Sequence, residues 1–253
     1  MELTNSTIKF VASLGLKKNR EANGCFVAEG TKCVRDTWGH FDCRMIVATR
    51  NWYEQFGHSG HHGKIVFASR QQMQRMSQFS TAAEVIAVYD IPQLTIDADE
   101  VRQNLNIILD NVQDPGNLGT IIRLADWFGV KNIFCTCDTV DVYNHKVVQA
   151  TMGAISHVKV HYCDIEGLLE EFEGLPVWGT FLDGENIYRQ EVENRGFVIF
   201  GNEGKGISPR LAQHVSRRLL IPAFAQGDEA PESLNVGVAA AITISEFRRR
   251  QMK

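Results

Sequence analysis

The sequence contains no apolar run of the roughly 18 residues that a membrane-spanning helix needs. No basic patch followed by an apolar stretch stands at its N-terminus, so no secretory signal is visible and the cytoplasm is the expected location. Six cysteines in 253 residues are too few for a disulfide framework. Six prolines and 21 glycines exclude collagen-like and low-complexity chains. What remains is a globular protein, 44% hydrophobic and 22% charged, that can bury a sizeable core.

A net charge of −4 does not by itself indicate a nucleic-acid partner, but the charge is unevenly distributed. Nine acids and one base lie between Asp164 and Asn194, so the remainder of the chain carries about +4. Residues 1–50 hold eight Lys or Arg against five acids, and the chain ends in the basic tail Arg248–Lys253. Such clusters are usually solvated faces, yet they leave RNA binding open. We expect Lys17, Lys18 and Arg20 to contact RNA phosphates.

The most probable domain boundary is the polar stretch Asp90–Glu100, which contains one proline and four acids. It joins two strand-like runs, Glu84–Tyr89 and Asn106–Leu109. The sequence therefore predicts a smaller N-terminal domain at residues 1–95 and a larger C-terminal domain at residues 104–253.

Strand-like and helical stretches alternate in the C-terminal part, which indicates an α/β domain with a mainly parallel sheet. We predict strands at Asn106–Leu109, Asn132–Cys135, Val158–Tyr162, Pro176–Leu182, Phe197–Gly201 and Arg218–Pro222. We predict helices at Gly119–Gly129, Lys146–Gly153, Glu166–Phe172, Pro209–Val215 and Ser233–Arg250. The N-terminal part mixes both types, with helices at Lys9–Leu14 and Thr31–His40 and strands at Met45–Ala48 and Lys64–Ala68.

Three loops follow predicted strands: Asn111–Leu118, Gly201–Ser208 and Ala223–Ser233. Because ligands of parallel sheets bind beyond the carboxyl ends of the strands, these loops are the candidate site. Directly after the first loop, Gly119 permits close backbone approach, and Arg123 is expected in the first or second turn of a helix. A cation there gains nothing from the helix dipole, so it indicates a nearby anion or partner acid. The alternative is a surface arginine that caps a neighbouring loop.

The second loop, Gly201–Ser208, fails two familiar phosphate-binding patterns. Its glycines stand in the order Gly-x-x-Gly-x-Gly, which is not the dinucleotide fingerprint. Gly206 follows Lys205 where a Walker A loop requires Ser or Thr. Glu203 would repel a pyrophosphate and suits a ligand with positive charge or with hydroxyl and amino donors. A plain strand-to-helix turn is the alternative.

The third segment leads into the last helix. Ser233 is the expected N-cap of this helix, which places Asn235 in its first turn. Asn is not favoured there, so it indicates a polar role. The small residues Gly237–Ala241 indicate close packing of the helix against another element.

No metal site is expected. Cys135 and Cys137 lack a second pair at zinc-finger spacing. The histidines of the Gly-rich stretch, which are His58, His61 and His62, fit a solvated loop better than a ligand set. His157, His161 and Cys163 fit packing positions of a strand.

Taken together, the three loop segments resemble the SpoU (TrmH-like) family of RNA ribose 2′-O-methyltransferases, within the SPOUT superfamily. The first family motif is matched by Asn117, Gly119 and Arg123, and the second by Gly201, Glu203 and Gly206. The third is matched by Ile221, Pro222, Ser233, Leu234, Asn235 and Val236, across a loop that is longer than the usual family form. The stretch from Lys9–Leu14 to Phe26–Gly30 is similar to the family's N-terminal RNA substrate-binding domain, which has an L30e-like α/β fold.

The resemblance implies a trefoil-knotted methyltransferase domain, S-adenosylmethionine as methyl donor, and a homodimer with its active site at the subunit interface. It implies that main-chain groups around Thr180, Gly201, Ile221 and Leu234 hold the cofactor. The implied substrate is a ribose 2′-hydroxyl of tRNA or rRNA.

The resemblance also implies a catalytic set of Arg123, Asn117, Glu203, Ser233 and Asn235. Arg123 would bind the target phosphate and polarise the hydroxyl, because a free guanidinium keeps its proton. Asn117, Ser233 and Asn235 would orient Arg123 and the ribose, and Glu203 would tie Arg123 or its loop in place. Two alternatives are a catalytically inactive RNA-binding relative and a nucleotide-dependent enzyme on a doubly wound sheet.

Overall fold

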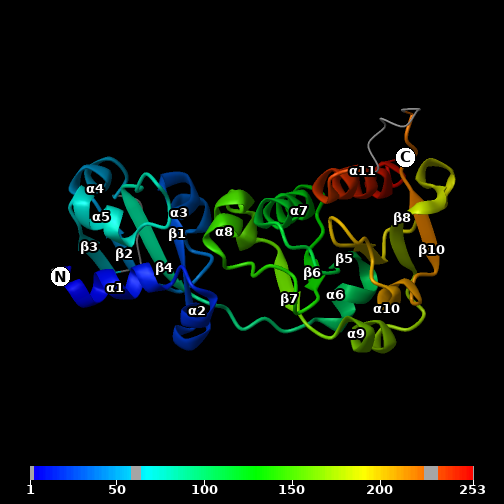
Figure 1. Ribbon diagram of the computed structural model, residues 1–253, viewed down its shortest axis with the longest axis horizontal. Helices are drawn as coiled ribbons and strands as arrows, with labels where there is room; N and C mark the ends of the chain where they lie inside the picture. The colour runs from blue at the N-terminus through cyan, green and yellow to red at the C-terminus, as the bar shows by residue number, and fades with distance from the viewer. Residues whose placement is uncertain (1–2, 58–63, 225–232, 253) are drawn as a thin grey trace. The chain divides into compact units, whose positions relative to one another are not determined.

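The structure is a computed structural model that describes residues 3–57, 64–224 and 233–252. The chain forms two compact units (Figure 1). Unit 1 comprises Met1–Gln93 and Asp141–Ser156, and unit 2 comprises Leu94–Val140 and His157–Lys253. The division after Gln93 falls within the predicted linker. Residues 141–156, however, do not follow the prediction that they belong to the C-terminal domain, since they pack on the first strand of unit 1.

Unit 1 is built on a four-stranded mixed sheet in the order β1-β4-β2-β3, in which only β2 and β3 are parallel. Its strands are β1 (Cys25–Glu29), β2 (Cys43–Ala48), β3 (Lys64–Phe67) and β4 (Val85–Asp90). Its helices are α1 (Asn5–Ser13), α2 (Lys17–Asn23), α3 (Thr31–Thr37), α4 (Arg50–Phe56), α5 (Arg70–Met76), α8 (His145–Thr151) and the 3₁₀ turn η1 (Ala154–Ser156). Side chains of Thr4, Thr49 and Ser69 cap α1, α4 and α5, so short polar residues mark these helix starts.

Unit 2 is built on a six-stranded parallel sheet in the order β10-β8-β9-β5-β6-β7. Its strands are β5 (Leu105–Leu109), β6 (Asn132–Cys135), β7 (Lys159–Tyr162), β8 (Val177–Asn186), β9 (Gly196–Phe200) and β10 (Arg217–Leu220). Its helices are α6 (Ala98–Gln103), α7 (Pro115–Trp127), α9 (Ile165–Glu171), α10 (Pro209–Ala212), α11 (Val236–Arg249) and the 3₁₀ turn η2 (Ile187–Arg189). No helix in the described parts of the chain is long and apolar enough to cross a membrane.

The core of unit 2 explains why its strands read as continuous apolar runs. Every residue of β5, β6 and β9 is buried, as expected for a parallel sheet that is covered on both faces. Phe134, Phe172 and Phe197 join apolar residues of α9 and α10 in one cluster. The predicted α/β class and parallel sheet are confirmed, and each predicted strand overlaps an observed one.

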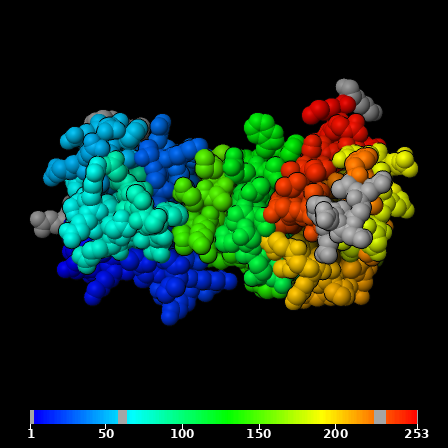
Figure 2. Space-filling model, turned by 45° about the horizontal axis from the view of Figure 1, so that its top comes forward, coloured from blue at the N-terminus to red at the C-terminus, as the bar shows by residue number. Residues whose placement is uncertain are grey.

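Helices α7 and α11 lie side by side at the surface of unit 2 (Figures 1 and 2). A β-carbon built on Gly237 of α11 would lie 3.3 Å from the Thr120 side chain of α7, so the two helices approach closely there. The close packing predicted for the small-residue run is therefore confirmed. The start of α11 was predicted wrongly, because Asn235 and not Ser233 is its N-cap.

Candidate functional site

The candidate site lies where adjacent strands of unit 2 end. Strands β10, β8, β9 and β5 are neighbours in the sheet, and all four run in the same direction. Gly201 directly follows β9, and Ile221 directly follows β10. Thr180 follows Gly179, the last β8 residue that pairs with β9, and Leu234 precedes the cap of α11. The four predicted cofactor residues therefore belong to segments at these strand ends or at the start of α11.

Glu203 ties the loop after β9 to the start of α7. Its carboxylate accepts hydrogen bonds from the backbone amides of Gln113 and Asp114, at 3.3 and 3.1 Å. It accepts a third from the side-chain amide of Asn117, at 2.9 Å. Glu203 was predicted to hold either Arg123 or the loop, and among the described residues it holds the loop and Asn117.

Asn235 extends this network to α11. Because a carboxylate only accepts hydrogen bonds, Asn117 presents its NH₂ group to Glu203 and its oxygen to Asn235. The Asn235 side chain donates to that oxygen across 2.8 Å. Its own oxygen accepts from the backbone amides of Gly237 and Val238, which caps the helix. We call the set of Glu203, Asn117 and Asn235 the carboxylate–amide relay.

The hydrogen bonds that Glu203 accepts determine its charge state. Burial alone would raise the pKa of its carboxyl, but the hydrogen bonds from Asn117, Asp114 and Gln113 outweigh burial and lower the pKa below its usual value. Glu203 is therefore ionised at neutral pH, and a charged acceptor forms stronger hydrogen bonds than a neutral one.

The loop from Gly201 to Gly206 presents backbone rather than bulky side chains. Asn202 and Gly206 exchange two backbone hydrogen bonds, at 3.0 and 2.9 Å. A β-carbon on Gly201 would lie 2.1 Å from the Gly206 carbonyl carbon, so this hairpin closes only on glycine. Gly206 has a φ of +69°, a second requirement for glycine.

Arg123 is not part of the hydrogen-bonded relay among the described residues. It is exposed, and it stands in the third turn of α7 rather than in the predicted first or second, because the helix begins at Pro115. Among the residues that the structure describes, its guanidinium forms no hydrogen bond or ion pair. Ser233 is also exposed and caps no helix. The structure thus brings together Asn117, Glu203 and Asn235 of the predicted catalytic set, and not Arg123 or Ser233.

The predicted RNA contacts divide into two kinds. Lys17 and Lys18 are exposed on α2 of unit 1. Arg20 is only 2% exposed and is engaged by Asp141 and by backbone carbonyl groups. The prediction that Arg20 contacts RNA is contradicted by this burial, which leaves its guanidinium no access to a phosphate.

Two acids of the site were missed by sequence reasoning. Asp114 caps α7 by accepting from the Asn117 backbone amide at 2.8 Å, and the Asp–Pro pair at 114–115 is the signal of a helix start inside the stretch that was predicted as a loop. Asp110 is 3% exposed at the end of β5 and accepts from the Ser208 amide at 2.6 Å. An acid at a strand end offers no comparable local signal.

The residues considered as metal ligands lie partly inside and partly outside the described ranges of the chain. His58, His61 and His62 lie outside the described residues. Within the described ranges no group of His, Cys, Asp and Glu side chains is arranged for a metal ion. His161 is buried and stacks on Phe134, which confirms its predicted packing role.

The loops at the strand ends contain glycine, asparagine and a charged glutamate, and the parallel sheet carries no phosphate-binding loop. These features define an α/β enzyme whose ligand is held largely by backbone groups. Residues 104–245 match the SpoU rRNA Methylase family, and residues 5–87 match the MRM3-like substrate binding domain. The chain belongs to the SpoU rRNA methylase family. This confirms the class predicted from the three motifs, an S-adenosylmethionine-dependent RNA 2′-O-methyltransferase.

Relatives and solved structures agree with this membership. The chain is 32% identical over 183 residues to the 23S rRNA (guanosine(2553)-2′-O)-methyltransferase RlmP of Bacillus subtilis, covering 71% of each chain. A putative RNA methyltransferase of the TrmH family from Porphyromonas gingivalis superposes with a TM-score of 0.87 and 36% identity, covering 98% of this chain and 99% of that one. An AdoMet-bound rRNA methyltransferase from Sinorhizobium meliloti superposes with a TM-score of 0.84 and 25% identity, over 100% and 99% of the two chains.

Proposed function

We propose that this protein methylates a ribose 2′-hydroxyl of large-subunit ribosomal RNA. The carboxylate–amide relay is the observation that carries the proposal, because it joins the three motif segments into one preformed site. The similarity to a 23S rRNA methyltransferase supports rRNA over tRNA. The cytoplasm stays the predicted location.

The residues at the strand ends fit the cofactor. Backbone groups around Gly201 and apolar side chains of Ile221 and Leu234 suit an adenosine and its thioether chain, and Thr180 offers a hydroxyl. Leu234 is 48% exposed, which leaves an apolar surface beside the relay segment. When bound, S-adenosylmethionine supplies an electrophilic methyl group. We further propose that the strand-end segments form the trefoil knot that the motifs predict.

Arg123 acts on the RNA in this proposal. The 2′-hydroxyl is a weak nucleophile until it begins to lose its proton, so the site must position it and stabilise the developing negative charge. Arg123 keeps its own proton and therefore serves as a donor rather than a base. Its planar guanidinium binds the neighbouring phosphate and donates to the 2′-oxygen, while the hydroxyl proton passes to solvent water late in the transfer.

The protein works as a homodimer through the surface formed by α7 and α11. Trp127 on α7 is 84% exposed, and Val238 on α11 is 47% exposed. Large apolar side chains at this exposure indicate a surface that a second copy covers. Arg123 lies on the same helix as Trp127, four residues before it, and has no partner among the described residues. We therefore propose that Arg123 of one subunit completes the site formed by the relay of the other.

Methylation mapping tests the function. Ribosomal RNA isolated from a strain that lacks the gene should accept a methyl group from labelled S-adenosylmethionine in the presence of the purified protein. Mapping of 2′-O-methyl positions should then show one new site in large-subunit rRNA. Binding of S-adenosylhomocysteine without any transfer would instead identify the inactive RNA-binding relative.

A mixing experiment tests the shared site. Arg123→Ala homodimers should be inactive and Glu203→Gln homodimers should keep at most about a tenth of wild-type activity, whereas subunit exchange creates heterodimers with one intact site. Activity after exchange should return to about a quarter of the wild-type value, because half of the dimers carry one working site of two. No recovery after confirmed exchange would place Arg123 and Glu203 in the same subunit's site.

A further inference from the structure

Residues 141–156 belong to unit 1 although they lie inside the stretch that matches the methylase family. The Tyr143 ring packs on Phe26 of β1, with 4.7 Å between ring centroids. The Ser156 hydroxyl donates to the Asp36 carbonyl oxygen of α3 at 3.4 Å. The methylase segment therefore supplies part of the surface of the substrate-binding unit.

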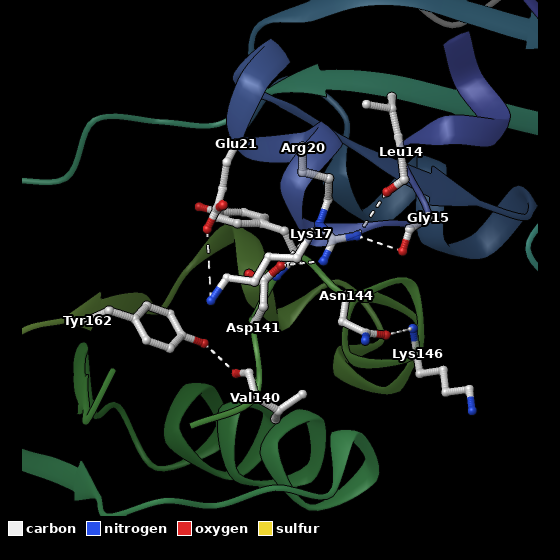
Figure 3. Close-up of polar contacts among 11 residues, drawn as sticks. Leu14, Gly15, Lys17, Arg20, Glu21, Val140, Asp141, Asn144, Lys146 and Tyr162 are labelled. Atoms are coloured by element: carbon white, nitrogen blue, oxygen red, sulfur yellow. Dashed lines mark hydrogen bonds and ion pairs between the residues drawn. The ribbon is translucent and has the colours of Figure 1, made fainter. Parts of the chain in front are cut away.

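The Arg20–Asp141 pair joins this segment to α2 (Figure 3). The Arg20 Nε donates to the Asp141 carboxylate at 3.0 Å, and its Nη1 donates to the carbonyl oxygens of Leu14 and Gly15 at 2.8 and 3.0 Å. The Arg20 side chain is 3% exposed, so the pair is largely shielded from solvent and salt. Breaking such a buried pair is costly, which fixes Asp141 against the start of α2.

Two hydrogen bonds within the segment from Asp141 to Lys146 fix the position of Lys146 at the start of α8. The second Asp141 oxygen accepts from the Tyr143 amide at 3.0 Å. Asn144 caps α8 by accepting from the Lys146 amide at 2.9 Å. In Figure 3, Lys17 and Lys146 lie on either side of Asp141. The buried Arg20–Asp141 pair thus holds α2 and the start of α8 together, and with them the lysines of both helices.

The lysines of α2 and α8 have few acidic partners. Lys18 and Lys146 are exposed and have no ion pair within the described residues, and Lys17 only reaches Glu21 at 3.9 Å. Asp141 is already neutralised by Arg20. Burial, and then the charges of Lys146 and Arg20, lower the pKa of His145.

We propose that Lys17, Lys18 and Lys146 form one surface on unit 1 that binds the phosphate backbone of RNA. Exposed ammonium groups without partner acids suit phosphate oxygens, and their counterions are released on binding. The proposal rests on the proposed function and adds to it an RNA contact carried by the methylase segment. The buried Arg20–Asp141 pair positions this surface and does not touch RNA.

The experiment compares Lys146→Ala with Lys64→Ala in the full chain. Lys64 is exposed on β3, which lies at the other edge of the four-stranded sheet from β1. A fluorescein-labelled single-stranded RNA of mixed sequence is titrated by anisotropy at several KCl concentrations. Lys146→Ala should weaken binding roughly fivefold and reduce the salt slope by about 0.7, as expected for one lost phosphate contact. Lys64→Ala should change neither value.

Two further variants keep the proposal open to contradiction. Lys146→Arg should retain wild-type affinity, because it keeps the charge. The double change Lys17→Ala and Lys18→Ala should weaken binding more than Lys146→Ala does, with unchanged thermal unfolding. An affinity and salt slope of Lys146→Ala equal to those of Lys64→Ala would overturn the proposal. Polyglutamate is titrated in the same way as a model of an acidic protein. If Lys146→Ala weakened polyglutamate binding and left RNA binding unchanged, the proposal would be overturned in favour of an acidic protein partner.

The methyl-transfer assay separates this proposal from the proposed function. If the wild-type protein methylates rRNA and Lys146→Ala binds RNA as tightly as wild type, only the surface is wrong. If wild-type protein binds S-adenosylhomocysteine and RNA but methylates no rRNA, the proposed function fails while the effect of Lys146→Ala on RNA affinity still supports the surface.

Discussion

Asn117 donates its side-chain amide to the Glu203 carboxylate across 2.9 Å, although 86 residues separate the two in the chain. The same Asn117 accepts from Asn235, 118 residues further on, at 2.8 Å. One carboxylate thereby fixes the orientation of two asparagine amides and the start of two helices. The three motif segments hold each other in position, so a substitution in one segment should displace the other two.

Glu203→Gln should break this arrangement. A glutamine has one acceptor oxygen for the three donors that Glu203 now satisfies, and its NH₂ group would face another donor. We expect kcat to fall roughly 10- to 100-fold from the displaced loop. The free energy of unfolding should fall by about 1 kcal/mol, since the site is partly exposed to solvent. Steady-state methylation and thermal unfolding measure the two effects.

The matched control is Glu193→Gln in the same unit. Glu193 is half exposed, and among the described residues it pairs only with Arg195 nearby in the chain, at 3.2 Å. It should keep wild-type turnover and stability, as expected for an exposed ion pair. Equal turnover for Glu203→Gln and wild type would show that the relay does not position the site.

Asn235 has two roles that different substitutions separate. Asn235→Ser retains a side chain that caps α11 but cannot reach Asn117 as the amide does. We expect near wild-type stability and reduced turnover. Asn235→Ala should lower both, with about 1 kcal/mol of stability lost with the cap. If Asn235→Ser kept full activity in methylation assays, the amide link to Asn117 would have no part in the reaction.

The lowered pKa of Glu203 predicts how stability responds to acid. A carboxyl whose pKa is lower in the folded than in the unfolded chain stabilises the fold above its unfolded pKa of about 4.3, and this contribution is lost as the pH falls through the folded pKa. The difference in melting temperature between wild type and Glu203→Gln should therefore be constant above about pH 5 and shrink toward pH 3. Circular dichroism melts at each pH measure it, and a constant difference down to the lowest pH would contradict the pKa direction.

Local pattern was sufficient for the strands of unit 2 and for the loops of the site. Buried parallel strands are apolar throughout, so the run at Asn132–Cys135 was predicted with its observed ends. Gly201 and Glu203 were recognisable because they stand directly after such a run. The helix caps were less well predicted, because Ser233 and Asn235 are both good capping residues and tertiary contact with Asn117 decides between them.

The fate of charged residues could not be predicted from local sequence. Arg20 stands beside two exposed lysines, and only the fold brings Asp141 to it from 121 residues away. The same applies to the segment 141–156, whose pattern fits the α/β alternation of unit 2 while its side chains pack in unit 1. Composition reports how many charges a stretch holds, whereas long-range packing decides which of them reach solvent.

The Arg20–Asp141 pair should be structural. Arg20→Ala leaves a buried carboxylate without its partner and should lower the free energy of unfolding by about 3 kcal/mol. Replacing both partners, Arg20→Met with Asp141→Leu, should recover much of that loss, since no charge is then left buried. Chemical denaturation of wild type, Arg20→Met, Asp141→Leu and the double variant forms the cycle. Lys18→Ala is the control, and a loss of stability there equal to that of Arg20→Ala would remove the distinction between the two residues.

Arg123 provides the most direct test of the catalytic proposal. It is exposed and without a partner among the described residues, so Arg123→Ala should leave the melting temperature and S-adenosylhomocysteine affinity unchanged. Methyl transfer should fall at least roughly 1,000-fold if Arg123 stabilises charge at the 2′-oxygen and its phosphate. Arg123→Lys should also fail, because a point charge does not reproduce a planar group that holds phosphate and hydroxyl together. Arg195→Ala, a half-exposed arginine of the same unit, is the control and should retain full activity. A lysine variant with near-normal turnover on rRNA from the deletion strain would refute the role assigned to Arg123, because charge alone would then be sufficient.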